Sequence, residues 1–369
     1  MSQLTYASSI NEIANLILVL GTKRTILVEG DMGSGKSSIH SMLGDVLSGY
    51  TMCYLDASVL DVGDVSIPNV MAIDHDGNHI PYVTFAPNEN FGIHKGKPVC
   101  LMIDEIGKAP NSAKNSLLRV CHPENGVRHV GNYPLPEGSI VFATTNLGSE
   151  GVGDVFLPHQ NDRFTIVRMR KCNALEQIEY GINNEWESSV LGFIKEFPQI
   201  LQSFEDVVNP SDNPYIFHPK EMRRKFVTPR GLEAASDLLK LRAELDTTTM
   251  TNALIGTIGE RGAMDLMAFV QLADQLPTLE SIKNDPHNAL VPTSAGAVVM
   301  TVFRSLAVMD RSWIDAWMDY LVRLDAEAQG LFSNGVRTEN YKHQSIVFTN
   351  KKFTQWSLAN AHMYTADKV

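Results

Sequence analysis

The stretch "VEGDMGSGKSS" (residues 28–38) follows the apolar run "TILV" and leads into a predicted helix. It matches the pattern G-x-x-x-x-G-K-[S/T], which Gly30, Gly35, Lys36 and Ser37 satisfy. Phosphates need several inward-pointing backbone N–H groups, and glycines let the backbone come close, while the following helix offers its positive end. The stretch therefore predicts a phosphate-binding cradle. The predicted cradle consists of Gly30, Asp31, Met32, Gly33, Ser34, Gly35, Lys36, Ser37 and Ser38.

Two pairs of residues are expected to bind or act on the phosphates. Lys36 is expected to reach the β- and γ-phosphates of ATP, and the Ser37 hydroxyl to bind Mg²⁺. The apolar run "LMIDEI" ends in Asp104 and Glu105. We expect Asp104 to hold the Mg²⁺ ion through water and Glu105 to act as general base on the attacking water. ATP and Mg²⁺ are therefore the expected ligands.

Three more polar residues are candidates for the chemistry. Asn146 ends "VFATTN", on a strand predicted between the cradle strand and the carboxylate strand, where it would position the attacking water. Arg163 in "NDRF" would stabilise the charge on the γ-phosphoryl oxygens from a neighbouring subunit, with Arg168 and Arg170 as competing candidates. Arg230 in "VTPRG" lies in the first turn of a predicted helix, where the positive helix end disfavours a cation unless a phosphate lies nearby.

The pattern of apolar segments predicts the fold class. "TILVEG", "TMCYLDAS", "PVCLMIDEI" and "GSIVFATTN" are expected strands, separated by helices. This order is typical of a parallel sheet covered by helices on both faces, with ligands beyond the carboxyl ends of its strands. Helical patterns dominate after about residue 171. We therefore expect an α/β P-loop NTPase core followed by an α-helical lid and a further helical region.

Composition excludes several function classes. The 369 residues contain 31 Lys and Arg against 42 Asp and Glu, a net charge of −11, which argues against nucleic acid as a partner. The four cysteines form no CxxC pair, and the eleven histidines show no HExxH, so no structural metal is expected. The first twenty residues resemble an amphipathic helix rather than a signal peptide, and no run of ~18 apolar residues predicts a membrane span. A cytoplasmic location is expected.

Taken together, these motifs resemble those of the AAA+ ATPases. "GDMGSGKS", "LMIDEIGKAP", "ATTN", "NDRF" and "TPR" occur in the order found in that family, and the resemblance covers about residues 10–245. Two inserts are similar to those of the MoxR-like group within it. They are "DVGDVSIPNVMAIDHDGNHIPYVTFAPNENFG" and "GVRHVGNYPLPEGS". The sequence departs from the group at Gly107 and Lys108, where Asn and Arg are more usual.

The resemblance implies more than the residues do. It implies a homo-oligomer, as a hexameric ring with ATP bound between subunits, with Arg163 acting in trans and Arg230 from the lid of the same chain. It also implies that the ring remodels a protein partner, such as one with a von Willebrand A domain. The expected domains are a core over 1–170 with inserts near 59–97 and 126–139, a lid over 171–245, and an extension over 246–369.

Other functions remain open at this stage. A nucleic-acid motor that assists restriction or replication would share these motifs, and only the acidic charge argues against it. A guanine-specific enzyme would need an N-K-x-D motif, which the sequence lacks. A slow nucleotide-dependent interaction module is a third possibility, although such a protein has no chemical need for Glu105, Asn146 and Arg163.

Overall fold

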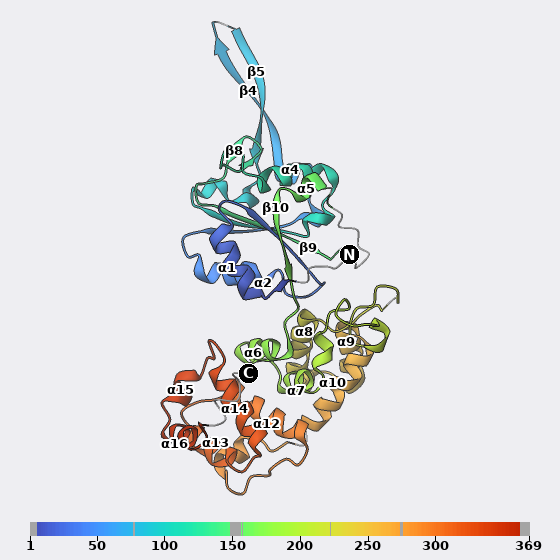
Figure 1. Ribbon diagram of the computed structural model, residues 1–369, viewed down its shortest axis with the longest axis vertical. Coiled ribbons are helices and arrows are strands. Elements are labelled where there is room, and N and C mark those ends of the chain that lie inside the picture. Colours follow the sequence, from blue (N-terminus) through green and yellow to red (C-terminus); the bar gives the residue numbers. More distant parts are fainter. Residues whose placement is uncertain are drawn as a thin grey trace. The chain divides into compact units, whose positions relative to one another are not determined.

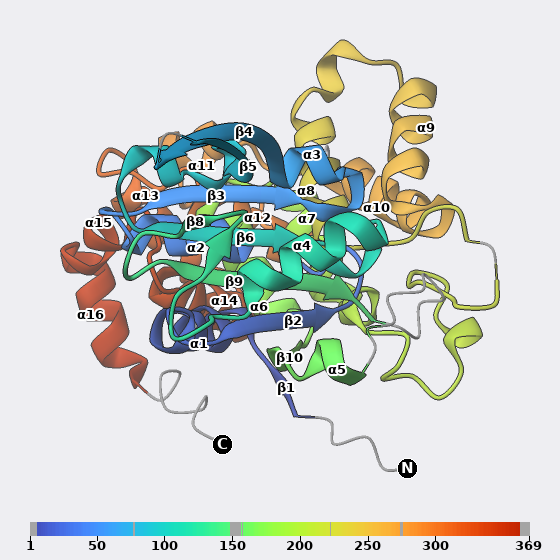
Figure 2. The ribbon, with the colours of Figure 1, turned by 90° about the horizontal axis from the view of Figure 1, so that it is seen from above.

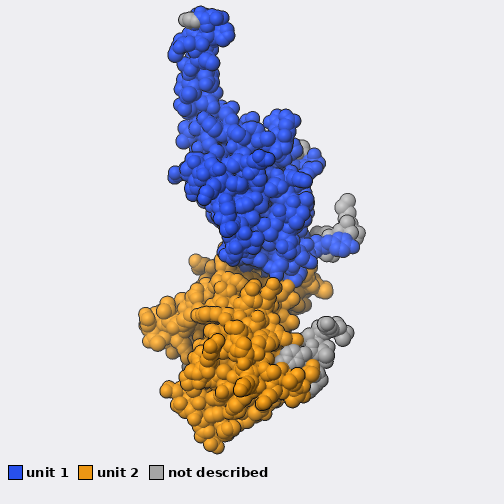
Figure 3. Space-filling model, turned by 90° about the vertical axis from the view of Figure 1, so that its left-hand side faces the viewer, with its two compact units in different colours: residues 1–171 blue, residues 172–369 orange. Residues whose placement is uncertain are grey.

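The computed structural model describes residues 6–76, 78–147, 156, 158–221, 223–273 and 276–361. The chain divides into two compact units, residues 1–171 and residues 172–369, which Figure 3 shows in different colours. Each unit is described by itself. The predicted boundary between a lid and an extension falls inside unit 2 and stays a prediction, and residues 362–369 of the predicted extension lie outside the described residues.

A parallel sheet forms the centre of unit 1 (Figures 1 and 2). Its strand order is β1-β10-β2-β9-β6-β3, and every neighbouring pair is parallel. The strands are β1 (Ala7–Ser8), β2 (Thr25–Gly30), β3 (Thr51–Asp56), β6 (Val99–Asp104), β9 (Ile140–Asn146) and β10 (Phe164–Met169). Because the strands are parallel, Gly30, Asp104 and Asn146 lie at one edge, called here the carboxyl edge. The opposite edge, where Thr25, Ile140 and Phe164 begin their strands, is called the amino edge.

Helices cover both faces of this sheet, because successive side chains of a buried strand point to opposite faces. Ile26 and Val28 of β2 pack in one core cluster with residues of α1 and α2, whereas Leu27 packs in another with residues of α4. Ser9 caps α1, and its side chain and that of Glu12 form a reciprocal pair of hydrogen bonds. The helices of unit 1 are α1 (Ile10–Leu20), α2 (Ser38–Val46), α3 (Val62–Val65), α4 (Asn111–Cys121) and α5 (Pro158–Asn161).

The sheet differs from the sequence prediction in two strands. All four predicted strands are present, and β9 lies between β2 and β6 as expected for Asn146. The sequence analysis assigned no strand to Phe164–Met169, which forms β10 beside β2, or to Ala7–Ser8, which forms β1. β10 is only half-buried and contains the polar residues Thr165 and Arg168, so its apolar pattern is weaker than that of the other strands.

Between β3 and β6 the chain forms a long antiparallel ribbon of β4 (Ser66–His75) and β5 (Asn78–Pro87), which extends away from the sheet in Figure 1. Both faces of the ribbon expose apolar side chains. Alternation along the strands groups these by face. One face exposes Ile67, Met71, Ile73, Ile80 and Tyr82, and the other Val70, Val83 and Phe85.

The second predicted insert forms the short hairpin of β7 (His129–Val130) and β8 (Tyr133–Pro134), which anchors the base of the ribbon. The Phe85 N–H donates to Asn132 Oδ1 at 2.7 Å, and the Asn132 N–H donates to the Phe85 carbonyl at 3.2 Å. Gly131 (φ 60°) makes this contact possible, because a Cβ there would lie 2.4 Å from the Phe85 carbonyl oxygen. The turn of the second insert is therefore joined to the base of the ribbon.

The described part of unit 2 is helical and has its own core. Trp317, Tyr320 and Phe332 are fully buried in it. Two helical stretches are interrupted: residues 174–196 by a turn at Glu185 (φ 56°), and residues 314–337 between Leu321 and Ala326. Within the described residues, no helix is both long and apolar enough to cross a membrane. The helices are α6 (Ala174–Asn183), α7 (Ser188–Glu196), α8 (Pro229–Lys240), α9 (Thr247–Ile258), α10 (Glu260–Ala273), α11 (Leu279–Asn284), α12 (Ala295–Ala307), α13 (Ile314–Leu321), α14 (Ala326–Arg337), α15 (Gln344–Phe348) and α16 (Lys351–Ala359).

Candidate nucleotide site

The cradle is a strand–loop–helix junction at the carboxyl edge. β2 ends at Gly30, the loop turns through Gly33 (φ 67°) and Gly35 (φ 93°), and α2 begins at Ser38. Left-handed backbone at both glycines explains why other residues would be strained there. The Ser34 hydroxyl is buried in this loop without a hydrogen-bond partner among the described residues. A phosphate oxygen would supply that partner, so the cradle fits a phosphate ligand.

Lys36 is held inside the cradle. Its side chain is buried, with 7% exposed, and Nζ donates to the carbonyls of Gly30 and Asp31, both at 2.8 Å. It also donates to Asn146 Oδ1 at 2.9 Å. The structure thus brings together Lys36 of the cradle loop and Asn146 of β9. An ammonium group with three oxygen acceptors is fully hydrogen-bonded, which offsets much of the cost of burying its charge.

Asp104 receives three hydroxyl groups. Ser37 Oγ donates to Oδ2 at 3.1 Å, the Tyr54 hydroxyl donates to Oδ2 at 2.8 Å, and Thr144 Oγ1 donates to Oδ1. Ser37 and Asp104 offer hydroxyl and carboxylate oxygens, which are the ligands that Mg²⁺ prefers. These residues therefore fit the expected ion. The described residues contain no group of three or more His, Cys, Asp or Glu that could hold a metal.

Glu105 is positioned by its backbone and by two side chains. Its φ of 51° lies in the left-handed region, and its N–H donates to Thr144 Oγ1 at 3.2 Å. Lys108 Nζ forms an ion pair with Oε2 at 2.8 Å, and Asn146 Nδ2 lies 3.5 Å from Oε1. Glu105 is therefore restrained between a lysine and an amide in this structure.

Three residues of this network were not predicted from the sequence: Tyr54, Thr144 and Lys108. Tyr54 lies on β3, two residues before the strand ends, and its partner Asp104 ends the neighbouring strand β6. Thr144 is in the quoted "ATTN" motif, but the motif alone does not say which side chain faces β6. Lys108 appeared only as a departure from the related group. Hydroxyl groups near the ends of adjacent parallel strands were the available signal.

Arg163 lies away from this network, directly before β10 at the amino edge. Its Nη1 donates to the Leu118 carbonyl in α4 at 3.3 Å. The competing candidates lie elsewhere, since the β10–β2 register places Arg168 opposite Glu29, and Arg170 follows the end of the strand. The structure therefore separates Arg163 from the other candidates by the length of a strand.

Arg230 lies in unit 2. It occupies the first turn of α8, is exposed, and follows Thr228, whose Oγ1 accepts the N–H of Gly231 at 2.9 Å. The cap agrees with the sequence pattern. The role of Arg230 towards a nucleotide stays a prediction.

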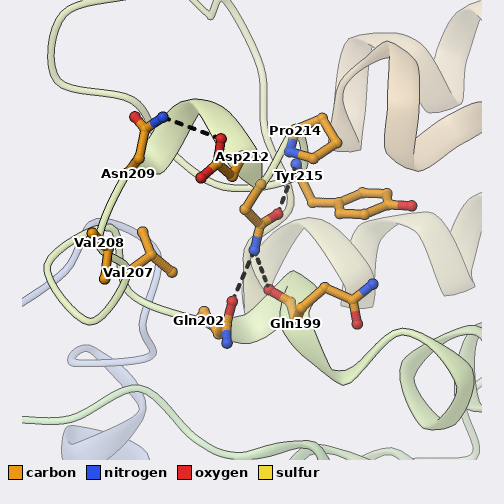
Figure 4. A pocket seen from close by; sticks show the side chains of 9 residues that line it. Gln199, Gln202, Val207, Val208, Asn209, Asp212, Pro214 and Tyr215 are labelled. Carbon is orange, nitrogen blue, oxygen red and sulfur yellow. Dashed lines mark hydrogen bonds between the residues drawn. The ribbon is translucent and has the colours of Figure 1, made fainter.

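Unit 2 also contains a pocket of about 270 Å³ (Figure 4). The Asn213 side chain donates to the Gln199 carbonyl at 2.8 Å and to Gln202 Oε1 at 3.0 Å, and it accepts the N–H of Tyr215 at 3.1 Å. Because these lining groups already bond to one another, we assign the pocket no ligand. Its lining is Gln199, Gln202, Val207, Val208, Asn209, Asp212, Asn213, Pro214 and Tyr215.

No family model and no curated protein matches this chain. Among solved structures, a candidate ATPase of Cytophaga hutchinsonii is 22% identical, over 47% of this chain and 50% of that protein, with a TM-score of 0.33. This chain thus spans half of that protein's length. The Thermotoga maritima RuvB Holliday junction branch migration motor is 14% identical over 74% of this chain and 72% of its own, with a TM-score of 0.35. NtrX from Brucella abortus is 14% identical over 96% and 69%, with a TM-score of 0.32.

Likenesses of this size do not assign a function, so the fold class rests on the chain's own features. These are a parallel sheet with helices on both faces, a glycine-rich cradle after a central strand, and a helical second unit. The expected fold class, a P-loop NTPase core followed by helical regions, is confirmed.

Proposed function

We propose that the chain is an AAA+ ATPase of the MoxR-like type, which hydrolyses ATP in a ring, expected to be a hexamer, and remodels a protein partner. One observation carries the proposal. The carboxyl edge gathers Lys36, Ser37, Asp104, Glu105 and Asn146 into one hydrogen-bonded network, whereas an arginine precedes β10 at the opposite edge. The network would supply most of an ATPase site, and we propose that the arginine completes the site of a second copy.

The chemistry at the carboxyl edge follows from the residues present. The cradle N–H groups and Lys36 bind the β- and γ-phosphates, and Ser37 and Asp104 would hold Mg²⁺, which neutralises phosphate charge when bound. Glu105 takes a proton from the water that attacks the γ-phosphorus, and Asn146 orients that water. The leaving ADP oxygen separates from the phosphorus in the same displacement. Nucleotide binding has to compete for Lys36 with its present acceptors, Gly30, Asp31 and Asn146.

The strand length supports a shared site. β2 has six residues, so its two ends are roughly 17 Å apart at ~3.3 Å per residue. The cradle begins at one end, and Arg163 lies beside the other. Within unit 1, Arg163 is therefore on the wrong edge to stabilise the phosphates of its own cradle. An arginine supplied in trans stabilises transition-state charge in many such enzymes.

The ribbon of β4 and β5 supports a protein partner. Its exposed apolar side chains lie on both faces, with Val70 at 71% and Val83 at 55% exposed. Exposed apolar surface of this kind often marks a site of protein–protein interaction. Contacts with nucleic acid need cations instead. We propose that the ribbon contacts the protein on which the ring acts, such as one with a von Willebrand A domain.

Lys36→Ala tests the nucleotide site, and Lys97→Ala, at an exposed lysine of unit 1, is its control. Loss of a charged contact to phosphate is expected to weaken ATP binding on the order of 10- to 100-fold. The measurement is titration with a fluorescent ATP analogue, followed by ATP turnover. Equal binding by both variants would contradict the proposal. Stimulation of the wild-type ATPase by DNA rather than by protein would favour a nucleic-acid motor, and negligible turnover in the assembled state would favour an interaction module.

A further inference from the structure

The amino edge of unit 1 contains a pocket of about 290 Å³ whose charged lining is entirely cationic. We call it the cationic pocket. Its lining is Lys23, Arg24, Thr25, His122, Pro123 and Arg163. Three chain segments meet here: the turn before β2, the end of α4 and the residue before β10. None of the described lining residues is a carboxylate, so the lysine and two arginines give the pocket a local positive charge on a chain that is acidic overall.

The cations of this pocket have no counter-ion within the described part of the chain. Among the described residues, no ion pair or side-chain hydrogen bond involves Lys23 or Arg24, and both are exposed. Within the described ranges, the acceptor of the Arg163 side chain is a backbone carbonyl, that of Leu118. Like charges that gather without carboxylates create a field that attracts anions.

A fourth cation lies behind the pocket wall. Arg128 is 5% exposed, and its Nη2 donates to Oγ1 of Thr25, a lining residue, at 3.4 Å. Its Nη1 donates to the Thr22 carbonyl at 2.7 Å, while Nε is buried without a partner among the described residues. Burial lowers the pKa of Arg128, because desolvation disfavours its charged form. An anion in the pocket would compensate that charge.

We propose that the cationic pocket binds the polyphosphate of ATP held in the cradle of a second copy of this chain, with Lys23 and Arg24 acting beside Arg163. This inference rests on the proposed function and adds two binding residues to it. The two edges of the sheet are complementary in charge. At the carboxyl edge Lys108 is paired with Glu105, and Lys171 lies 3.8 Å from Asp31. A triphosphate bound there meets cations that already have partners, whereas Lys23 and Arg24 at the amino edge have no counter-ion among the described residues.

The same chemistry could come from a free phosphate anion, and the second copy is favoured because of the size of the group. A pocket of this volume, with cations on two segments, suits a chain of phosphates better than a single one. Arg163 would then meet the γ-phosphoryl oxygens, and Lys23 and Arg24 the adjoining oxygens. Bound ATP would thereby strengthen the contact between copies.

The test compares wild type with the double variant Lys23→Ala/Arg24→Ala, and Lys97→Ala serves as the control. Sedimentation at several protein concentrations measures self-association with a non-hydrolysable ATP analogue and without nucleotide. The double variant is expected to weaken nucleotide-dependent association on the order of 10-fold or more, and the control to leave it unchanged. Addition of salt should reduce the difference between wild type and the double variant, because the contact is electrostatic.

Two further arms separate the possible failures. Titration of dilute chain with a fluorescent ATP analogue reports the cradle alone. If the double variant binds the analogue as wild type does but associates equally well, the inference is overturned while the proposed function stands. If wild type binds no ATP, the inference and the proposed function are both contradicted. Inorganic triphosphate is also titrated into Lys36→Ala: tight binding that needs Lys23 and Arg24, without an effect of these residues on association, would assign the pocket to a free anion instead.

Discussion

The cations at the two edges of the sheet differ in how far they are paired with acceptors or counter-ions. At the carboxyl edge, Lys36 is buried with three oxygen acceptors, and Lys108 is paired with Glu105. At the amino edge, Lys23 and Arg24 have no counter-ion among the described residues, and Arg163 bonds only to a helix carbonyl. One edge is a complete cradle that restrains its own charges, and the other is an exposed set of charges without a cradle.

In the proposed mechanism, each edge of the parallel sheet supplies half of a site. Parallel strands put all their carboxyl ends together, so the chain can build only one cradle there. Groups at the amino ends are a strand length away and cannot serve that cradle. They become useful only if a second copy brings its carboxyl edge to them, which is a head-to-tail contact of the kind that closes into rings.

Replacement of Glu105 by Gln would break the carboxyl edge with the largest effect. The amide keeps the shape of the carboxylate but cannot take the proton from water, so turnover should fall on the order of 10²- to 10⁴-fold. Binding of a fluorescent ATP analogue should be retained. Steady-state turnover is measured beside Glu137→Gln, an exposed carboxylate of the same unit. A Glu105→Gln variant as active as this control would remove Glu105 from the mechanism.

Replacement of Gly21 by Ala would disturb the amino edge. Gly21 ends α1 and leads into the turn that carries Lys23 and Arg24, and a Cβ there would lie 2.5 Å from the Ile17 carbonyl oxygen and 2.6 Å from Ile140 Cγ2. Overpacking of this kind should lower the free energy of unfolding by about 1–3 kcal/mol.

Gly49→Ala is the matched control for this prediction, because nothing lies within 4 Å of the corresponding Cβ. Denaturation by urea measures both variants. If Gly21→Ala and Gly49→Ala unfold at the same urea concentration, the turn at the amino edge is packed less closely than described here.

The smallest effect concerns His40 on α2, the helix that follows the cradle. Its Nε2 is buried without a hydrogen-bond partner among the described residues, and burial lowers the pKa of its imidazole below the ordinary value of 6.5. The unfolded chain therefore binds a proton at a pH where the folded chain does not. The contribution of His40 to the free energy of unfolding should be fully present above pH 6.5. It should decline as the pH falls from there through the lower pKa of the folded state.

His40→Gln should consequently show a smaller loss of thermal stability than wild type when the pH is lowered from about 7 to about 5.5. Melting temperatures at several pH values measure the difference, and His94→Gln, at an exposed position, is the control. Parallel curves for wild type and His40→Gln would show that the buried imidazole does not couple folding to pH.

Much of the fold follows from sequence because its central strands are buried on both faces. β2, β6 and β9 are almost continuous apolar runs that end in polar residues, so their type, order and common edge can be inferred. The cradle can also be predicted from sequence, because backbone geometry requires its glycines at fixed spacing. β10 was missed because it is only half-buried and carries Arg168 within it.

The parts of the site that sequence did not predict depend on contacts between distant segments. Tyr54 and Thr144 reach Asp104 from two different strands, and no local pattern records which hydroxyl faces a neighbouring strand. The cationic pocket is a similar case, because Arg24 and Arg163 become neighbours only through the pairing of β10 with β2. Because these two residues are far apart along the chain, the sequence does not indicate that they form a cluster.

The central claim, that each ATP site is shared between two copies, is tested most directly by mixing two inactive variants. Glu105→Gln lacks the base at the carboxyl edge, and Arg163→Ala lacks the arginine at the amino edge. Each alone should lose turnover, by on the order of 10²-fold or more for Glu105→Gln and 10³-fold for Arg163→Ala. Co-expressed and assembled together, they should recover activity well above the sum of the two, because some contacts then join an intact Glu105 to an intact Arg163. Full activity of Arg163→Ala alone, or a co-assembled mixture no more active than its parts, would contradict the shared site.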